Sequence, residues 1–115
     1  MLGGVTVEVK KLEECSFVEI IDMKKEDFEK SFEASTMNLG QIESLRKLLS
    51  LQFEAMGQQV KDLNDFKNKA VESNDTETAE KAQGLIEQIS SLMFSMEYKA
   101  TLLYNKSQKL IAETQ

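Results

Sequence analysis

The chain has 115 residues, with 14 Lys and Arg side chains against 20 Asp and Glu side chains, and its formal net charge is −6. It has no histidine and a single cysteine, which excludes an imidazole general base, a histidine metal ligand, an intramolecular disulfide and a zinc knuckle. The acidic balance argues against nucleic acid as a partner, because a nucleic-acid binder needs a basic face to neutralise phosphates.

The N-terminal third carries most of the acidic excess and has its own sequence pattern. Valines alternate with polar residues over 5–9, and residues 17–21 are β-branched and apolar, so both runs are expected as short strands. A two-stranded hairpin is only marginally stable alone in water. Two interpretations stay open: a small β-hairpin supported by the helices, or a disordered segment that orders on assembly.

A short helix is expected over residues 24–34. Phe28 and Phe32 are four residues apart in it and therefore share one face. Cys15 precedes this helix and is expected to be an inert thiol, because no histidine or cluster of bases is near it in sequence to lower its pKa. Residues 1–38 are thus treated as an N-terminal segment.

A long helix is predicted from residue 39 to about residue 72. Asn38 has capping-box spacing with Gln41, and apolar residues keep helical periodicity beyond it. Gly57 lies inside this helix and costs about 1 kcal/mol relative to alanine. It is also a place where another helix could approach closely.

The polar run of residues 72–78 predicts a loop, with a second capping-box pattern between Asn74 and Glu77. A last helix is predicted over 76–113. Its apolar positions step alternately by four and three residues, which is a heptad seam in which eight of nine residues are apolar. The seam consists of Ala82, Ile86, Ile89, Met93, Met96, Ala100, Leu103, Ser107 and Leu110.

The connection between the two long helices is only about five residues long, and a connection of that length forces them to run antiparallel. The expected fold class is therefore mainly α, with residues 39–115 as a coiled-coil-like antiparallel helical hairpin. The N-terminal segment adds its short helix and either a small β-hairpin or disorder.

The last helix has more apolar surface than one neighbouring helix can cover. Seven large residues lie off its seam: Leu85, Leu92, Phe94, Tyr98, Leu102, Tyr104 and Ile111. Burying one such side chain is worth about 1.5–3 kcal/mol, so we expect the N-terminal segment, a second copy or another protein to cover them. We assign these seven residues to a partner or self-assembly interface.

The sequence offers little for catalysis or ligand binding. Its only glycine pair, Gly3-Gly4, lacks phosphate-binding spacing, and no Asp-rich loop has the spacing of a cation site. We therefore expect no enzyme activity, no cofactor, no metal and no small-molecule substrate.

No run of 18 apolar residues occurs, so no transmembrane segment is expected. The N-terminus lacks the basic and apolar regions of a secretory signal peptide. We expect synthesis in the cytoplasm, and export by a route that needs no cleaved signal stays open.

Part of the last helix is similar to a known family. The run 85–98, Leu-Ile-Glu-Gln-Ile-Ser-Ser-Leu-Met-Phe-Ser-Met-Glu-Tyr, followed by 105–111, Asn-Lys-Ser-Gln-Lys-Leu-Ile, resembles the C-terminal helix of inner-rod subunits of the bacterial type III secretion system. The resemblance covers mainly residues 82–115. It implies that copies pack helix on helix around a channel, with the exposed apolar stripe as the subunit contact.

Two functions follow as hypotheses. The first is a self-assembling structural subunit of a secretion apparatus. The alternative is a small secretion chaperone, or an inhibitor or adaptor, that binds one partner protein through the hairpin. In that case the acidic N-terminal segment would suit a basic target surface.

Overall fold

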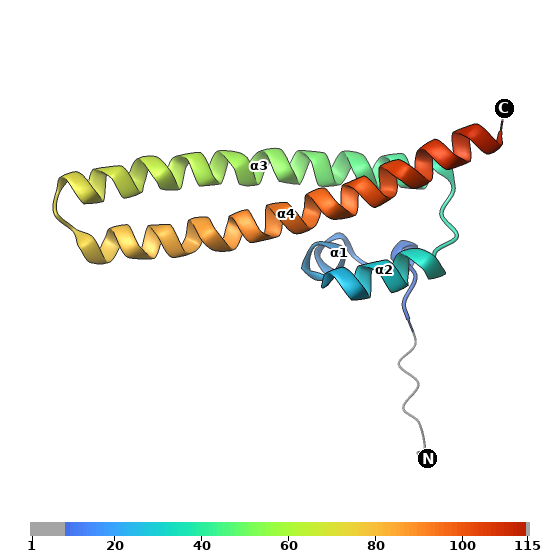
Figure 1. The fold of residues 1–115 in the computed structure, drawn as a ribbon, viewed down its shortest axis with the longest axis horizontal. Helices are drawn as coiled ribbons and strands as arrows, with labels where there is room; N and C mark the ends of the chain where they lie inside the picture. Colours follow the sequence, from blue (N-terminus) through green and yellow to red (C-terminus); the bar gives the residue numbers. More distant parts are fainter. Residues whose placement is uncertain (1–8, 115) are drawn as a thin grey trace, which may run out of the picture.

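The computed structural model describes residues 9–114, and Figure 1 shows their arrangement. The elements are η1 (Leu12–Glu14), α1 (Phe17–Asp22), α2 (Lys25–Ala34), α3 (Leu39–Glu72) and α4 (Thr76–Glu113). The two long helices α3 and α4 lie side by side and antiparallel (Figure 1), so the helical hairpin is confirmed. No strand occurs in the described part of the chain.

The strand expectation for residues 17–21 is wrong, because this run forms α1. The Ser16 hydroxyl accepts a hydrogen bond from the Glu19 backbone N–H at 3.2 Å, and the Glu19 carboxylate accepts one from the Ser16 N–H at 2.9 Å. This capping box satisfies two N–H groups at the helix start and outweighs the β propensity of the apolar run. The other expected strand, 5–9, falls outside the described residues except for its last residue.

The first half of the hairpin begins as the sequence predicts. Asn38 and Gln41 form a reciprocal capping box with both hydrogen bonds at 2.9 Å. Ile42, Leu45 and Leu49 are then buried at the start of α3. The cap and the apolar spacing thus fix where α3 begins and which face it buries.

The turn between the long helices occupies residues 73–75, and the N-cap of α4 is one residue later than expected. Asp75, not Asn74, is the N-cap of α4, and its carboxylate accepts from the Thr78 N–H at 3.2 Å. Asn74 has a φ of 60°, the left-handed conformation that ends a helix. The Asp75 N–H donates to the Ala70 carbonyl at 2.8 Å, and the Asn74 N–H donates to the Val71 carbonyl at 3.1 Å. These two bonds make a Schellman motif, which returns the chain as an antiparallel helix.

The heptad seam of α4 faces the core throughout. Five of its nine residues are buried and the other four are half-buried. Ser107 is fully buried, and its hydroxyl donates to the Tyr104 carbonyl at 2.7 Å, which satisfies it inside the seam. At about 1.5 Å per residue α4 is about 57 Å long.

Gly57 is not needed for a close helix approach. A Cβ at this position would lie 3.7 Å from the Met93 Cε atom, an ordinary van der Waals contact. The neighbouring helix therefore leaves room for a side chain at Gly57.

The described part of the N-terminal segment, residues 9–38, packs on one side of the hairpin, against the C-terminal half of α4 (Figure 1). Its own ends are tied together: the Leu12 N–H donates to the Ser35 hydroxyl at 2.9 Å, and the Glu13 carboxylate accepts from the Thr36 N–H at 3.0 Å. Leu12, Ile20 and Phe28 are almost fully buried and join one core cluster with residues of both long helices. In α2 the rings of Phe28 and Phe32 stack with centroids 6.0 Å apart, as their spacing predicts.

Candidate interaction surface

The structure divides the seven candidate interface residues of α4 into two groups. Phe94, Leu85 and Tyr104 are exposed, at 75%, 48% and 46% of their surface. The others are half-buried, and these are Leu92, Tyr98, Leu102 and Ile111. Part of the surplus apolar surface is therefore covered within the single chain, and the rest is open.

Lys99 joins the N-terminal segment to α4 through a set of buried hydrogen bonds. Its side chain is fully buried, and its ammonium donates to the backbone carbonyls of Ile20, Ile21 and Met23 at 2.8, 2.9 and 2.8 Å. These carbonyls are at the C-terminal end of α1, where a helix lacks internal donors and its dipole favours a cation. All three N–H groups of the ammonium are thus satisfied by a helix end 76 to 79 residues away in the sequence.

The ammonium of Lys99 is buried next to an aromatic side chain. Its ammonium lies 5.7 Å from the centre of the Phe28 ring, an arrangement that favours a cation. Burial lowers the pKa of Lys99, and the neighbouring Asp22 acts in the opposite direction. Removing this charge therefore takes both a helix cap and a cation–π contact from the N-terminal segment.

The sequence interpretation missed Lys99, although a signal was present. Leu85, Leu92 and Lys99 are spaced by seven residues and so share one heptad position and one face of α4. A lysine in an apolar row either reaches solvent or meets acceptors. The sequence could have raised that question, but it could not have named the α1 carbonyls as the acceptors.

Tyr98 makes a second link between α4 and α2. Its hydroxyl hydrogen-bonds to the Glu29 carboxylate, and the Lys25 ammonium lies 4.8 Å from its ring centre. The bond to Glu29 and then burial raise the pKa of the Tyr98 phenol. Tyr98, predicted as an intermolecular contact residue, is engaged here within one chain.

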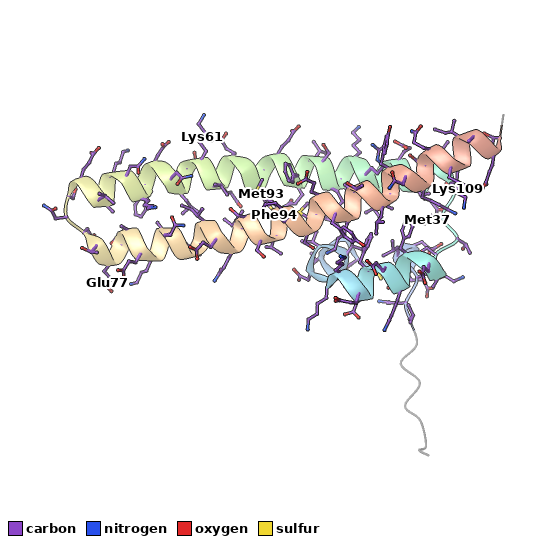
Figure 2. All side chains as sticks on the ribbon, in the orientation of Figure 1. Met37, Lys61, Glu77, Met93, Phe94 and Lys109 are labelled. Atoms are coloured by element: carbon purple, nitrogen blue, oxygen red, sulfur yellow. The ribbon has the colours of Figure 1, made fainter. Side chains whose placement is uncertain are left out.

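A groove runs between α3 and α4 and contains the most exposed aromatic ring of α4. One hollow of about 190 Å³ lies between Phe53 and Phe94, with Met93 and Ser90 also in its wall. A second hollow of about 450 Å³ shares Phe53 and Glu97 with the first. Figure 2 labels Met93 and Phe94 as neighbours on α4. The two hollows thus form one continuous surface with an aromatic side chain beside a cavity.

The rim of this groove is electrically balanced. The larger hollow is lined by two acidic and two basic residues, Glu43, Glu97, Arg46 and Lys47. Arg46 pairs with Glu43 at 2.8 Å, and its guanidinium also lies 4.8 Å from the Tyr104 ring centre. The groove therefore lacks the acidic excess of the chain as a whole.

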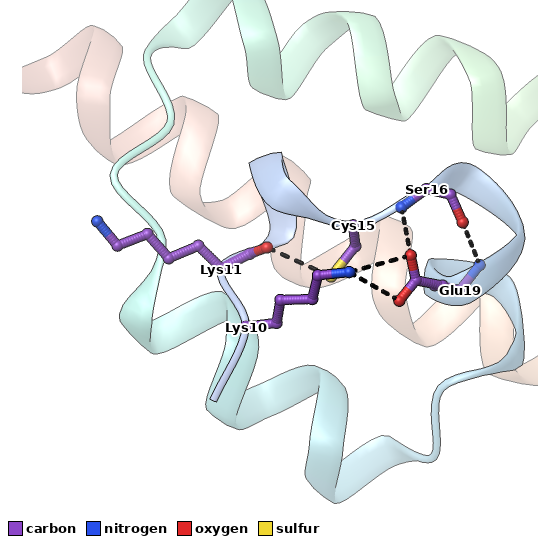
Figure 3. Close-up of polar contacts among 5 residues, drawn as sticks. All are labelled: Lys10, Lys11, Cys15, Ser16 and Glu19. Carbon is purple, nitrogen blue, oxygen red and sulfur yellow. Dashed lines mark hydrogen bonds and ion pairs between the residues drawn. The ribbon is translucent and has the colours of Figure 1, made fainter. Parts of the chain in front are cut away.

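Cys15 lies beside a hollow of about 580 Å³ between the N-terminal segment and the start of α3. Its thiol donates to the Lys11 carbonyl at 3.3 Å, and Figure 3 shows this contact beside the Ser16–Glu19 capping box. Burial raises the pKa of Cys15, and the nearby Glu19 adds to that effect. The protonated form is therefore favoured, as an unreactive thiol requires.

Acid is expected to weaken the N-terminal segment through Glu13 and Glu19. Partial desolvation raises the pKa of Glu13, but hydrogen bonds from its own N–H and from Thr36 outweigh it. The pKa of Glu19 is lowered by the Ser16 N–H and by Lys10. Both folded pKa values lie below the ordinary 4.5. The stability that these two carboxylates give to the folded segment is therefore complete above pH 4.5 and is lost as the pH falls through their lowered pKa values.

Amide exchange of residues 12–36 near neutral pH, about pH 5 and about pH 3 measures this loss. The double variant Glu13→Gln with Glu19→Gln should exchange faster than the original chain at neutral pH and change less on acidification. An equal acid response in the two proteins would show that other carboxylates control it.

No described helix combines the length and the apolar character needed to cross a membrane. Among the described residues, no group of three or more His, Cys, Asp or Glu side chains is placed to hold a metal ion. The features that stand out are the groove with Phe94 and the Lys99-linked N-terminal segment. Comparison of the chain with protein-family models, curated proteins and solved structures gave no significant match.

Proposed function

We propose that this chain is a non-enzymatic protein that binds protein through its helical hairpin, and that its partner is a second copy of itself. The observation that carries the proposal is the contiguous aromatic surface of the groove. Phe94, 75% exposed, and Phe53, 36% exposed, line one hollow. Contiguous exposed apolar surface in a water-soluble fold marks an interaction site.

Two properties of the groove favour a second copy as the occupant. An interface with two-fold symmetry needs a surface that fits itself, and this one offers both a projecting ring, Phe94, and the hollow beside it. Copies with a net charge of −6 repel one another. The repulsion is weakest where the rim carries both signs, as Glu43, Arg46, Lys47 and Glu97 do. Two hairpins joined by this face would make a four-helix bundle.

The variant Phe94→Glu tests this interface. Each copy would lose one buried ring and gain a charge, and the two-fold axis doubles the effect, so the dissociation constant of the dimer should rise by about a hundredfold. Light scattering coupled to size exclusion over a wide concentration range measures it. Because Phe94 is exposed in the single chain, helicity should be unchanged.

Gln88→Glu is the matched control, because it adds the same charge at an exposed position of α4 outside the groove lining. It should dimerise like the original chain. A chain that stays monomeric at millimolar concentration, or equal weakening by both variants, would refute self-assembly through this groove. Binding of one other protein in fixed proportion, without self-assembly, would favour the chaperone or adaptor function.

We place this assembly, again as a proposal, in a bacterial secretion apparatus of the type III kind. Its support is the resemblance of residues 82–115 to inner-rod subunits, of which residues 82–113 lie in the continuous helix α4. A rod requires open assembly, in which each copy uses two different surfaces. Electron microscopy should then show rings or helical filaments once a second surface of each copy is uncovered. Closed dimers alone, in the original chain at high concentration and also in variants that uncover more of α4, would contradict the placement.

A further inference from the structure

The face of α4 that contains Leu85 and Leu92 is only partly covered. Leu85, Leu92 and Lys99 occupy one heptad row, and the N-terminal segment binds it at Lys99. Two heptads earlier, Leu85 is 48% exposed. The apolar stripe therefore continues beyond the segment that covers it.

The covering helices are short for such a stripe. A heptad row is the seam of a long helix pair, whereas α1 has 6 residues and α2 has 10. A long helix from a second copy would match the length of the row, and α3 and α4, with 34 and 38 residues, are helices of that length.

The hydrogen bonds of residues 9–38 fall into two sets, one within the segment and one to α4. The ends of the segment are held to each other by the Leu12–Ser35 and Glu13–Thr36 hydrogen bonds, and residues 35–38 connect it to α3. Its polar attachments to α4 are the three bonds of Lys99 and the bond between Tyr98 and Glu29. Charged hydrogen bonds of this kind are stronger than neutral ones and depend on geometry.

We propose that residues 9–38 are an autoinhibitory cover, latched by Lys99, over part of a second self-assembly face of α4 that contains Leu85, Leu92 and Leu102. The inference rests on the proposed function and extends it. The open groove joins two copies into a closed dimer. Release of the cover adds a second, different surface to each copy and allows assembly beyond the dimer, because two different interfaces generate open chains.

The variant Lys99→Gln opens the latch without adding apolar surface to α4. It removes the charge and at least one of the three donors, and amide exchange of residues 12–34 should become about ten to a hundred times faster than in the original chain. Lys109→Gln is the matched control, because Lys109 is an exposed lysine of the same helix (Figure 2). A second variant, Ile20→Ala, loosens the cover from its own side and leaves α4 unaltered.

Light scattering then reads the assembly state of each protein. We expect Lys99→Gln and Ile20→Ala to form species larger than the dimer at concentrations where the original chain and Lys109→Gln stop at the dimer. Adding Leu92→Glu to Lys99→Gln should return it to the dimer, which separates a specific face from general aggregation of an opened core. The proposal would be overturned if amide exchange were unchanged in both Lys99→Gln and Ile20→Ala, or if it became faster without species larger than the dimer. It would also be overturned if Leu92→Glu did not reduce those larger species.

Phe94→Glu distinguishes failure of this inference from failure of the proposed function. If the groove forms the dimer and cover release adds nothing, only the inference fails. If Phe94→Glu leaves the original dimer intact, the groove proposal fails. With Phe94→Glu and Lys99→Gln combined, association through the second face should persist and be lost on adding Leu92→Glu.

Discussion

Leu103→Ala should lower the free energy of unfolding by about 2–5 kcal/mol. Leu103 is fully buried and belongs to the cluster that includes Leu12 and Phe28 of the N-terminal segment and Ile42 and Leu49 of α3. Truncating a leucine in such a place loses its transfer free energy and leaves a cavity that the rigid neighbours fill only in part. Because small domains are stable by only about 5–15 kcal/mol, this is a large share of the total.

Urea unfolding followed by circular dichroism measures the loss. Leu51→Ala is the matched control: it makes the same truncation on the other long helix at a side chain that is 55% exposed, and it should change stability by no more than about 0.5 kcal/mol. Similar values for the two variants would show that the packing of α4 against its neighbours is not the one described. The measurement belongs at low protein concentration, where the proposed dimerisation would not contribute.

Local signals in the sequence were enough to predict the hairpin. The Asn38–Gln41 capping box and the seam of α4 each depend on residues within one or two turns of one another. Such spacings determine where a helix begins and which face it buries, with little influence from the rest of the chain. The two long helices and their antiparallel arrangement followed from them.

The N-terminal segment could not be predicted in the same way. Residues 17–21 have β propensity, and the competing signal, Ser16 with Glu19 in capping-box spacing, was present and overlooked. What completes α1 is Lys99, which binds its last carbonyls from the far end of the chain. A helix of six residues is marginal alone, so its formation depends on a contact that sequence periodicity does not reveal.

The separation of the candidate interface residues into exposed and half-buried ones also depends on contacts between parts of the chain that are far apart in sequence. The sequence shows that Leu92, Phe94 and Leu102 lie off the seam, but all three look equally uncovered. Only the tertiary packing separates Leu92 and Leu102, which are half-buried, from Phe94, which is not. The surplus of apolar surface was thus predictable, whereas the part of it left open for a partner required the tertiary structure.

Phe28→Ala should remove about 3–5 kcal/mol of packing from the N-terminal segment. The ring is fully buried, stacks on Phe32 and lies under the Lys99 ammonium. We expect the loss to appear as local opening: amides of α1 and α2 should exchange much faster, while those near Met56 and Ile86 in the hairpin keep most of their protection. Phe66→Ala, at a ring that is 55% exposed on α3, is the control and should leave both regions unchanged.

The pattern of amide exchange in Phe28→Ala shows whether the N-terminal segment opens separately from the hairpin or together with it. Opening of η1, α1 and α2 together, with the hairpin still protected, means that the segment separates as one unit, because its Leu12–Ser35 and Glu13–Thr36 bonds tie its two ends. Such a unit can uncover α4 without unfolding the protein. If Phe28→Ala instead speeds exchange equally along the whole of α3 and α4, the segment and the hairpin share one cooperative core. A cover over α4 could then be released only by global unfolding, and the autoinhibitory role would be excluded.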